Sequence, residues 1–187
     1  LALSDLVAEL RERGLVDGTV TAGHAFGGDL EAVGLPSALL LARHVLDADI
    51  VIVGMGPGVV GTGTAYGNTG VDTGPALAAA RELGGRPVLC VRASDGDGRE
   101  RHRGLSHHSR GAARLAAGPI HVAAHPTEAA RLDHAVVHPV EVPDTAAILD
   151  GIDLRITTMG RTHAEDPLFF STAGAAAALA VELLEDP

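Results

Sequence analysis

A chain of 187 residues with 46% hydrophobic and 20% charged residues can bury one sizeable core but is too short for two ordinary domains, so we expect a single α/β domain over residues 1–187. The formal net charge of −10 repels phosphate backbones and disfavours nucleic acids and anionic membranes as partners. The fourteen basic residues are all arginine, which excludes lysine Schiff-base chemistry and a lysine-dependent phosphate loop.

Two further features bear on the cellular location of the protein. Cys90 is the single cysteine, which excludes an internal disulfide, and its apolar neighbours predict a buried strand thiol in a reducing, cytoplasmic setting. No apolar run approaches the ~20 residues that a membrane span needs, and the first residues show no signal-peptide pattern. The chain begins at Leu1 within a helical pattern and without an initiator methionine, so we expect it to be a piece of a longer chain.

Short β-branched runs alternate with alanine- and leucine-rich stretches of helical length, which is typical of repeated βαβ units. In chain order, the pattern predicts a helix at 4–13, a strand at 19–22, a helix at 36–46, a strand at 50–53, a helix at 75–83, a strand at 87–92, a helix at 106–116, strands at 120–123, 135–142 and 154–157, and a helix at 167–184. We therefore expect an α/β, Rossmann-like three-layer fold with a mostly parallel sheet and helices on both faces. In such a sheet, ligands sit in the crevice formed by loops that leave the carboxyl ends of strands.

The first such loop, residues 23–34, places His24, Asp29 and Glu31 within eight positions. Paired glycines between them let the backbone bring an acid back toward the histidine. His24 and Asp29 are therefore candidates for a catalytic acid/base pair or for two metal ligands. The alternative is a turn in which Asp29 caps a short helix.

The second loop, residues 54–70, contains the Gly-x-Gly-x-x-Gly spelling of a dinucleotide fingerprint. In that fold a helix starts within the motif and an acid follows about 20 residues later. Here the next helical pattern begins only near 72–75, and the nearest acid at a strand end is Asp95, so the spacing disfavours a nicotinamide or flavin cofactor. It favours a backbone cradle for a phosphate, carboxylate or metal-bound substrate, with a plain long turn as the alternative. The candidate ligand-binding residues are Gly56, Gly58, Gly61, Thr62, Gly63, Thr64 and, as a lid or stacking residue, Tyr66.

The third loop, residues 94–109, is dense in charges of both signs and in histidine. We expect Arg101 and Arg103 to bind an anion, because guanidinium groups neutralise phosphate and carboxylate. We expect His102 and His107 to transfer protons, because imidazole titrates near neutral pH. A solvated charged loop is the alternative, in which the Asp-Gly-Asp-Gly run is simply a turn.

A divalent metal is another use for the same histidines, with His102 and either His107 or His108 as ligands. Neighbouring side chains on a helix point about 100° apart, so we expect at most one of the adjacent pair at a given centre. Ser106, just before the pair, fits a helix cap.

A fourth segment, residues 157–170, holds further polar candidates. Arg161 and His163 could border the crevice. Asp166 followed by Pro167 predicts instead a helix N-cap and first-turn pair.

Four sequence blocks carry a resemblance to a known family. They are TAGHAFGGDLEAV, VIVGMGPGVVGTGT, RERHRGLSHH and TMGRTHAEDPLFF, which occur in this order and span nearly the whole chain. Together they resemble the bacterial family catalogued as domain of unknown function 3866. The resemblance implies that this chain is the C-terminal portion of a longer protein. It implies no reaction, substrate or cofactor.

Two functional hypotheses follow from the residues. In the first, the chain is a small-molecule enzyme, a hydrolase or group transferase, that holds a phosphorylated or carboxylated metabolite with the glycine-rich loop and the His/Arg-rich loop, with or without a divalent metal. In the second, the same crevice binds a nucleotide or similar metabolite without turnover, as a sensor or assembly module, which leaves a homo-oligomer open. Either way, the expected partner is a small anionic metabolite.

Overall fold

The computed structural model describes residues 4–56 and 58–185, and the chain divides into two compact units. The first unit comprises Leu1–Val59 and Ala79–Gly85, and the second comprises Val60–Ala78 and Arg86–Pro187. Each unit has secondary structure of its own, and α3 (Thr73–Glu82) runs through residues of both.

The first unit is built around a short parallel strand pair. Its elements are α1 (Asp5–Glu12), β1 (Val20–Ala22), β2 (Leu30–Ala32) and α2 (Leu35–His44). In the register of β1 and β2, Val20 lies opposite Leu30. The Asp29 carboxylate accepts hydrogen bonds from the backbone N–H and the hydroxyl of Thr19, both at 2.9 Å, and pairs with Arg11 at 2.7 Å. Asp29 therefore ties the starts of two strands together, and the alternative prediction that it caps a helix is wrong.

The second unit holds the remaining elements. In chain order they are η1 (Thr69–Asp72), α3, β3 (Ala93–Ser94), η2 (Glu100–His102), β4 (Gly104–Leu105), α4 (His107–Leu115), β5 (Ile120–Ala123), η3 (Thr127–Arg131), β6 (Ala135–His138), α5 (Thr145–Gly151) and α6 (Pro167–Glu185), where η marks a short 3-10 helix. β5 and β6 form a parallel pair, and β3 and β4 form an antiparallel one.

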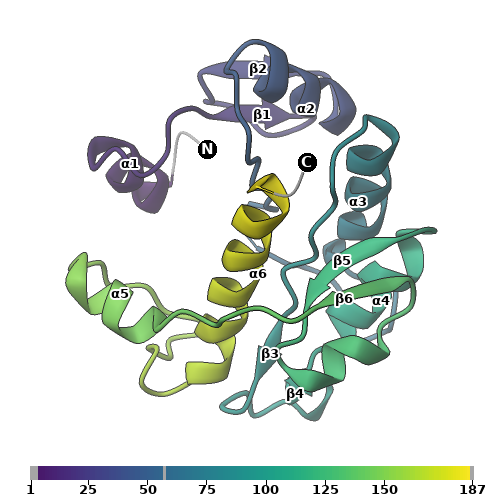
Figure 1. Ribbon diagram of the computed structural model, residues 1–187, viewed down its shortest axis with the longest axis vertical. Coiled ribbons are helices and arrows are strands. Elements are labelled where there is room, and N and C mark those ends of the chain that lie inside the picture. Colours follow the sequence, from purple (N-terminus) through teal and green to yellow (C-terminus); the bar gives the residue numbers. More distant parts are fainter. Residues whose placement is uncertain (1–3, 57, 186–187) are drawn as a thin grey trace. The chain divides into compact units, whose positions relative to one another are not determined.

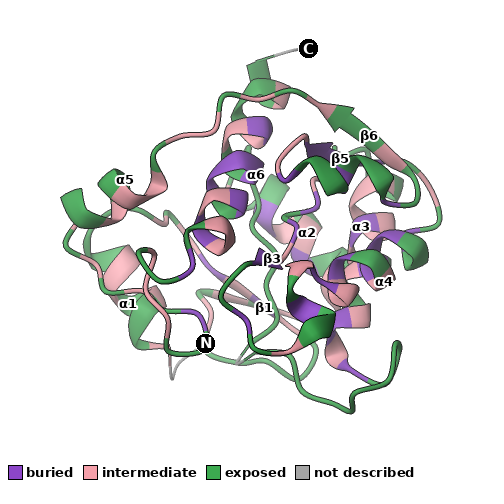
Figure 2. Cartoon of the chain, turned by 90° about the horizontal axis from the view of Figure 1, so that it is seen from below, coloured by how far each residue is buried: buried purple, intermediate pink, exposed green. Residues whose placement is uncertain are grey.

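Two hydrophobic clusters form the core of the second unit. The larger one includes Leu89, Ala113 of α4 and Ile120 of β5, and the smaller one includes Ala123 of β5 and Leu179 of α6. Figure 1 shows α6 beside β5. In Figure 2, buried residues gather on β5 and on one side of α6, whereas α5 has none. This core fixes the loop that follows β5 and the loop that leads into α4.

The helices predicted from the sequence are confirmed. The patterns at 4–13, 36–46, 75–83, 106–116 and 167–184 correspond to α1, α2, α3, α4 and α6. Among the strands, β1 and β5 confirm 19–22 and 120–123, whereas β6 covers only the first part of 135–142. The sequence missed β2, β4 and α5 because each has too few residues for a period to emerge.

Two predicted strands are wrong. Residues 50–53 and 154–157 lie outside every strand that the structure describes. Ile52 is 91% exposed, although its neighbours are β-branched and apolar. β-branched composition favours an extended backbone, but a strand also needs a hydrogen-bonded neighbour, which local sequence does not supply.

The strand predicted at 87–92 is found only in part. Within it, Val88 alone forms a strand-type bridge, with His121 of β5. Leu89 is buried and Cys90 is exposed, as alternation along an extended segment requires. The prediction of a buried thiol is therefore wrong, because Cys90 lies on the outer face of this segment.

The chain is a mixed α/β protein, as predicted, with helices and small parallel sheets. The described residues form three separate two-stranded sheets, β1–β2, β3–β4 and β5–β6. They do not form the single sheet of a Rossmann-like three-layer fold, so that finer arrangement is not confirmed.

By length and composition alone, α6 is long and apolar enough to cross a membrane, with a mean hydropathy of 1.6. The prediction that no segment approaches this length is wrong for this helix. A core helix passes the same test, and α6 packs against β5 and β3 while burying Phe170, Ala175 and Leu179. One side of α6 therefore belongs to the core of the second unit, with 33% of its most apolar stretch buried.

Candidate functional site: a three-histidine cluster

The candidate site lies where the short β3–β4 hairpin leads into the start of α4. Ser94 of β3 pairs with Gly104 of β4, and the loop between the two strands contains η2, which ends at His102. Gly104 has φ +59°, a left-handed conformation that glycine adopts readily. Ser106 then caps α4, because its hydroxyl accepts the backbone N–H of His108 at 3.2 Å. This confirms the predicted cap and places His102 beside the first residues of α4.

Three imidazole rings meet at this point, which we call the three-histidine cluster: His102, His107 and His108. The ring centroids of His107 and His108 are 4.3 Å apart, and that of His102 lies 4.9 Å from the first and 4.8 Å from the second. One ring nitrogen from each residue lies within 4.8 Å of the other two. The nitrogens of His107 and His108 thus converge although their Cβ atoms point apart, and whether both bind one metal stays a prediction. The rings turn toward each other beyond their Cβ atoms, so the angle between the Cα–Cβ bonds does not decide where the nitrogens lie.

Burial and hydrogen bonding hold the rings in place. His102 is only 1% exposed, and its Nδ1 lies 2.8 Å from Ser106 Oγ. His107 Nε2 is buried and has no hydrogen-bond partner among the residues that the structure describes. A buried ring nitrogen without a partner is uncommon in native proteins, and a metal ligand is one role that accounts for it.

The environment keeps the three rings neutral. Burial, followed by the charge of Arg92, lowers the pKa of His102 to about 4. Burial, followed by the neighbouring His107 ring, lowers the pKa of His108 to about 4. The pKa of His107 is also lowered, by burial and then by Arg101. Because neutral imidazole is the form that binds metals and accepts protons, the cluster is competent for either role at neutral pH.

A buried carboxylate fastens the loop beside the cluster. Asp97 is 2% exposed and accepts hydrogen bonds from Arg99 Nε at 3.0 Å, Arg99 Nη2 at 2.8 Å and Arg92 Nη2 at 3.0 Å. Its own backbone N–H donates to Ser94 Oγ at 2.9 Å. The hydrogen bond from Arg99 holds the pKa of Asp97 far below its usual value of 3.8. The Asp-Gly-Asp-Gly run does bend the chain, but the alternative of a solvated loop is wrong for Asp97.

A second buried carboxylate, Asp166, anchors the same loop from far along the chain. It directly precedes Pro167, as a cap would, but its carboxylate accepts hydrogen bonds from Ser94 Oγ at 2.5 Å, Asp95 N at 3.2 Å and Arg161 Nε at 3.1 Å. Burial would raise the pKa of Asp166, but the hydrogen bonds from Ser94 and Arg161 outweigh it and the pKa is lowered. Asp166 thus joins the start of α6 to the end of β3.

The glycine-rich loop reaches the cluster at its C-terminal end. A Cβ on Gly70 would lie 3.4 Å from His108 Cγ, so this part of the loop lies against that ring. Asn68 caps η1 by accepting the Gly70 N–H at 3.1 Å. The hydroxyls of Thr62 and Thr64 lie 2.7 Å from each other. They are engaged within their own turn, so the anion cradle stays a prediction.

The other predicted loop residues are spread over both units. Gly56 and Gly58 belong to the first unit and have open space around them, while Pro57 lies outside the described residues. In the second unit, Gly63 also faces open space, and Tyr66 is 50% exposed.

Arg101 and Arg103 are exposed on either side of His102. Neither side chain forms an ion pair in the part of the chain that the structure describes, so both are open to an anionic ligand. His24, by contrast, is exposed in the first unit, where Asp29 is bonded to Thr19 and Arg11. A catalytic role for His24 and Asp29 stays a prediction.

Sequence reasoning missed three partners of the buried carboxylates: Arg92, Ser94 and Arg161. Arg92 lies in a predicted strand and Ser94 just beyond it, where polar residues are usually solvated. The partner of Ser94 is 72 positions away, at Asp166, and no local pattern indicates such a pairing. The one available signal was composition: because the chain has no lysine, Asp97 and Asp166 can form such pairs only with arginine.

These features define a mixed α/β chain whose second unit carries a buried site of histidine, arginine and aspartate. The chain belongs to the family described as "Protein of unknown function (DUF3866)", whose profile matches residues 1–177 of 187. This confirms the resemblance carried by the four sequence blocks. No curated protein and no solved structure matches the chain. The family description assigns no reaction, so function has to be argued from the site.

Proposed function

We propose that this chain is a metal-assisted hydrolase or group transferase that acts on a small phosphorylated or carboxylated metabolite. The three-histidine cluster holds the metal ion, and arginines of the same loop bind the anionic group of the substrate. The observation that carries the proposal is the convergence of three imidazole nitrogens within 4.8 Å of one another.

The donor set suits a catalytic metal. Three histidines leave a tetrahedral Zn²⁺ one open position for water or substrate, whereas a structural zinc site is closed by a fourth protein ligand. In the tautomer with its proton on Nδ1, His102 donates to Ser106 and leaves Nε2 free, which is how a second residue usually orients a metal-bound histidine. His107 and His108 are partly buried, and their ring nitrogens already lie within 4.8 Å of each other and of one nitrogen of His102.

The surroundings suit an anionic substrate. A metal held by the three histidines would supply an activated water for hydrolysis. The ion network beside the cluster contains three arginines and two aspartates, and this composition favours an anionic ligand over a cationic one. The exposed Arg101 lowers the pKa of His107 through its charge, and it is the proposed ligand for a phosphate or carboxylate group of the substrate. Asp97 and Asp166 are occupied by arginines, so their role is to position the loop.

A second candidate function is metabolite binding without turnover, in a sensor or assembly module. The excess of arginine over aspartate favours it, because such a site attracts an anion without any metal. The same arginines would then hold the ligand, and the histidines would transfer no proton.

Metal binding is the first test. The full chain, purified without a polyhistidine tag, is titrated with Zn²⁺ and its metal content is measured by mass spectrometry after gel filtration. We expect about one zinc per chain, and binding at least about tenfold weaker in His107→Gln and in His108→Gln. The matched control is His44→Gln, because His44 is exposed on α2 in the first unit. No zinc binding, or binding that neither cluster variant weakens, overturns the metal assignment.

Turnover then separates the two candidates. The zinc-loaded chain is offered p-nitrophenyl phosphate, and release of p-nitrophenol is followed for the wild type and for His107→Gln. Hydrolysis that the variant loses supports the enzyme. Saturable binding of inorganic phosphate without hydrolysis supports the binding module instead.

The proposal also includes expectations about the fold, the partners, the location and the oligomeric state of the chain. The parallel pairs β1–β2 and β5–β6 support a Rossmann-like arrangement, and hydrogen-exchange protection that extends from β5 and β6 into residues 87–92 would test it. The net charge of −10 supports a chain that leaves nucleic acids and anionic membranes alone, and the single cysteine supports a cytoplasmic setting. Sedimentation equilibrium tests whether the chain forms a homo-oligomer.

A further inference from the structure

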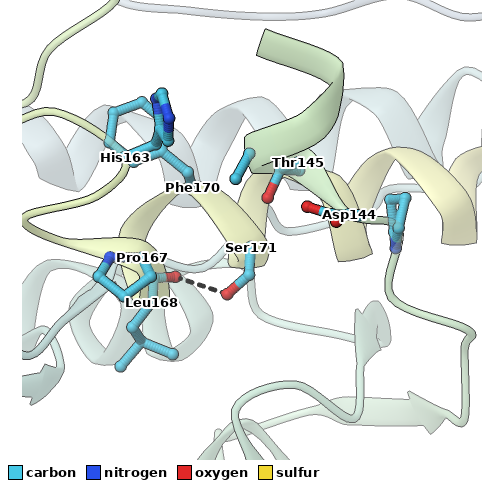
Figure 3. Close-up of a pocket in the computed structure, with 9 residues that line it drawn as sticks. Asp144, Thr145, His163, Pro167, Leu168, Phe170 and Ser171 are labelled. Carbon is cyan, nitrogen blue, oxygen red and sulfur yellow. Dashed lines mark hydrogen bonds between the residues drawn. The ribbon is translucent and has the colours of Figure 1, made fainter. Parts of the chain in front are cut away.

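A cavity of about 240 Å³ lies between the start of α5 and the start of α6, within the second unit (Figure 3). Pro143 and Leu168 contribute to its apolar walls. Thr145 and Ser171 contribute hydroxyl groups from the two facing helices, and His163 contributes a ring. A small concave space with apolar walls and a few polar groups is the usual composition of a small-molecule site.

Close packing gives this cavity a fixed shape. A Cβ on Gly174 would lie 2.4 Å from Thr145 Cγ2 and 3.1 Å from Pro143 Cγ, so glycine is what permits the approach of α6 to the start of α5. Asp144 caps α5 by accepting the Ala147 N–H at 3.0 Å. Asp144 also lines the cavity and no arginine does, so the lining suits an uncharged ligand and repels an anion.

Ser171 has a base within hydrogen-bonding distance. His125 Nε2 lies 2.8 Å from Ser171 Oγ, and both residues are partly buried. The hydroxyl also lies 3.1 Å from the carbonyl oxygen of Leu168 (Figure 3). Because a hydroxyl has one proton, Ser171 donates either to Leu168 or to His125. Donation to His125 is the arrangement of a serine activated by an adjacent general base.

The position of the pair in the fold is that of a ligand site. His125 lies two residues beyond the end of β5, at the carboxyl end of a parallel strand, and Ser171 lies on α6, which packs against β5. α/β proteins place ligands at this end of their strands. Neither residue takes part in the three-histidine cluster or in the ion network beside it.

We propose that Ser171 and His125 are the nucleophile and base of a second catalytic site, which hydrolyses small uncharged esters. Ser171 Oγ forms a bond to the ester carbonyl carbon, and its proton passes to His125 Nε2. The ester C–O bond breaks, and His125 gives that proton to the leaving alcohol. Water then attacks the acyl carbon while one of its protons passes to His125, the bond from that carbon to Ser171 Oγ breaks, and His125 returns the proton to Oγ as the carboxylic acid leaves. The reaction requires no metal.

A fluorophosphonate reagent tests the nucleophile directly, because it reacts with activated serines and spares ordinary hydroxyls. The full chain is treated with the reagent, and labelled peptides are measured over time by mass spectrometry. We expect Ser171 to be labelled at least about tenfold faster than Ser37, an exposed serine whose hydroxyl donates to the carbonyl of Gly34. Equal rates at the two serines overturn the proposal, and this comparison needs no variant.

His125→Gln tests the base. Glutamine keeps a hydrogen-bonding group beside Ser171 but cannot take up its proton. We expect labelling of Ser171 and hydrolysis of p-nitrophenyl acetate to fall about a hundredfold, while the thermal midpoint of unfolding reports that the variant is folded. Wild-type rates in this variant overturn the proposal. A chelator is expected to leave both rates unchanged, which separates this site from the metal site.

Discussion

In the histidine-rich loop, Asp97 and His102 are at most 2% exposed, whereas residues 61–67 of the glycine-rich loop are exposed throughout. The histidine-rich loop is held by a carboxylate from a distant segment, Asp166. The glycine-rich loop is held by bonds within its own turn, such as that between Thr62 and Thr64. Both follow segments predicted as strands, and both have the composition of a ligand site.

This difference indicates which of the two loops carries the functional groups. Buried polar groups have to be satisfied by the fold, and groups that the fold leaves unpaired, such as His107 Nε2, point to a ligand. Exposed glycines, and hydroxyls that form hydrogen bonds with each other, do not indicate a ligand. We therefore take the histidine-rich loop as the candidate site and propose that the end of the glycine-rich loop, at Gly70, supports it.

The largest expected effect comes from removing the distant anchor. Asp166→Ala leaves Arg161 and Ser94 without their buried carboxylate, and removal of one partner of a buried ion pair costs about 3–5 kcal/mol. We expect the free energy of unfolding, measured with urea, to fall by that amount. The matched control is the exposed pair Thr62→Ala with Thr64→Ala, expected to lose no more than about 1 kcal/mol. Similar losses in the two variants would break the comparison.

Acid titration sharpens the same contrast. The pKa of Asp97 lies well below the usual 3.8 because Arg99 donates to its carboxylate. The unfolded chain therefore takes up this proton at a higher pH than the folded chain does, and stability is lost as the pH falls below about 4. The loss is at most about 1.4 kcal/mol per pH unit for one carboxylate.

We accordingly expect the stability of the wild type to fall more steeply than that of Asp97→Asn between about pH 4 and pH 2.5, where only the wild type has this carboxylate to protonate. Urea denaturation at several pH values measures both slopes. Parallel curves would mean that the ion pairs of Asp97 with its arginines do not stabilise the folded chain.

The parts of the structure that could be predicted have local causes. The helix at α4 follows from its composition, and Ser106 caps it because the hydroxyl can reach an N–H two residues on. The density of charged residues and histidines in residues 94–109 identified that loop as a candidate site. The pairing of Ser94 with Asp166 could not be predicted, because it joins residues 72 positions apart and depends on how α6 packs.

The failed predictions have the opposite cause. Residues 50–53 have the composition of a strand, but pairing depends on a neighbour elsewhere in the chain. The convergence of the His107 and His108 rings was not expected from backbone angles, because the ring positions depend on side-chain torsions and on the approach of His102.

The smallest expected effects lie in the glycine-rich loop and decide whether it supports the cluster. Gly61 has φ +143°, and a Cβ there would lie 2.3 Å from the carbonyl oxygen of Gly67, so Gly61→Ala is expected to cost about 1–3 kcal/mol. Gly63 has nothing within 4 Å of such a Cβ, so Gly63→Ala should stay within about 0.5 kcal/mol. Thermal unfolding measures both.

Zinc affinity gives the two glycine variants a second use. If the loop positions Gly70 against His108, strain at Gly61 shifts that contact and weakens zinc binding, whereas Gly63→Ala leaves it unchanged. If Gly61→Ala lowers stability but leaves zinc affinity at the wild-type value, the loop is a turn with no part in the site. In that case the histidine-rich loop and its buried carboxylates build the site, because in the described residues the hydrogen bonds of His102 and of the α4 cap go to Ser106 and not to the glycine-rich loop.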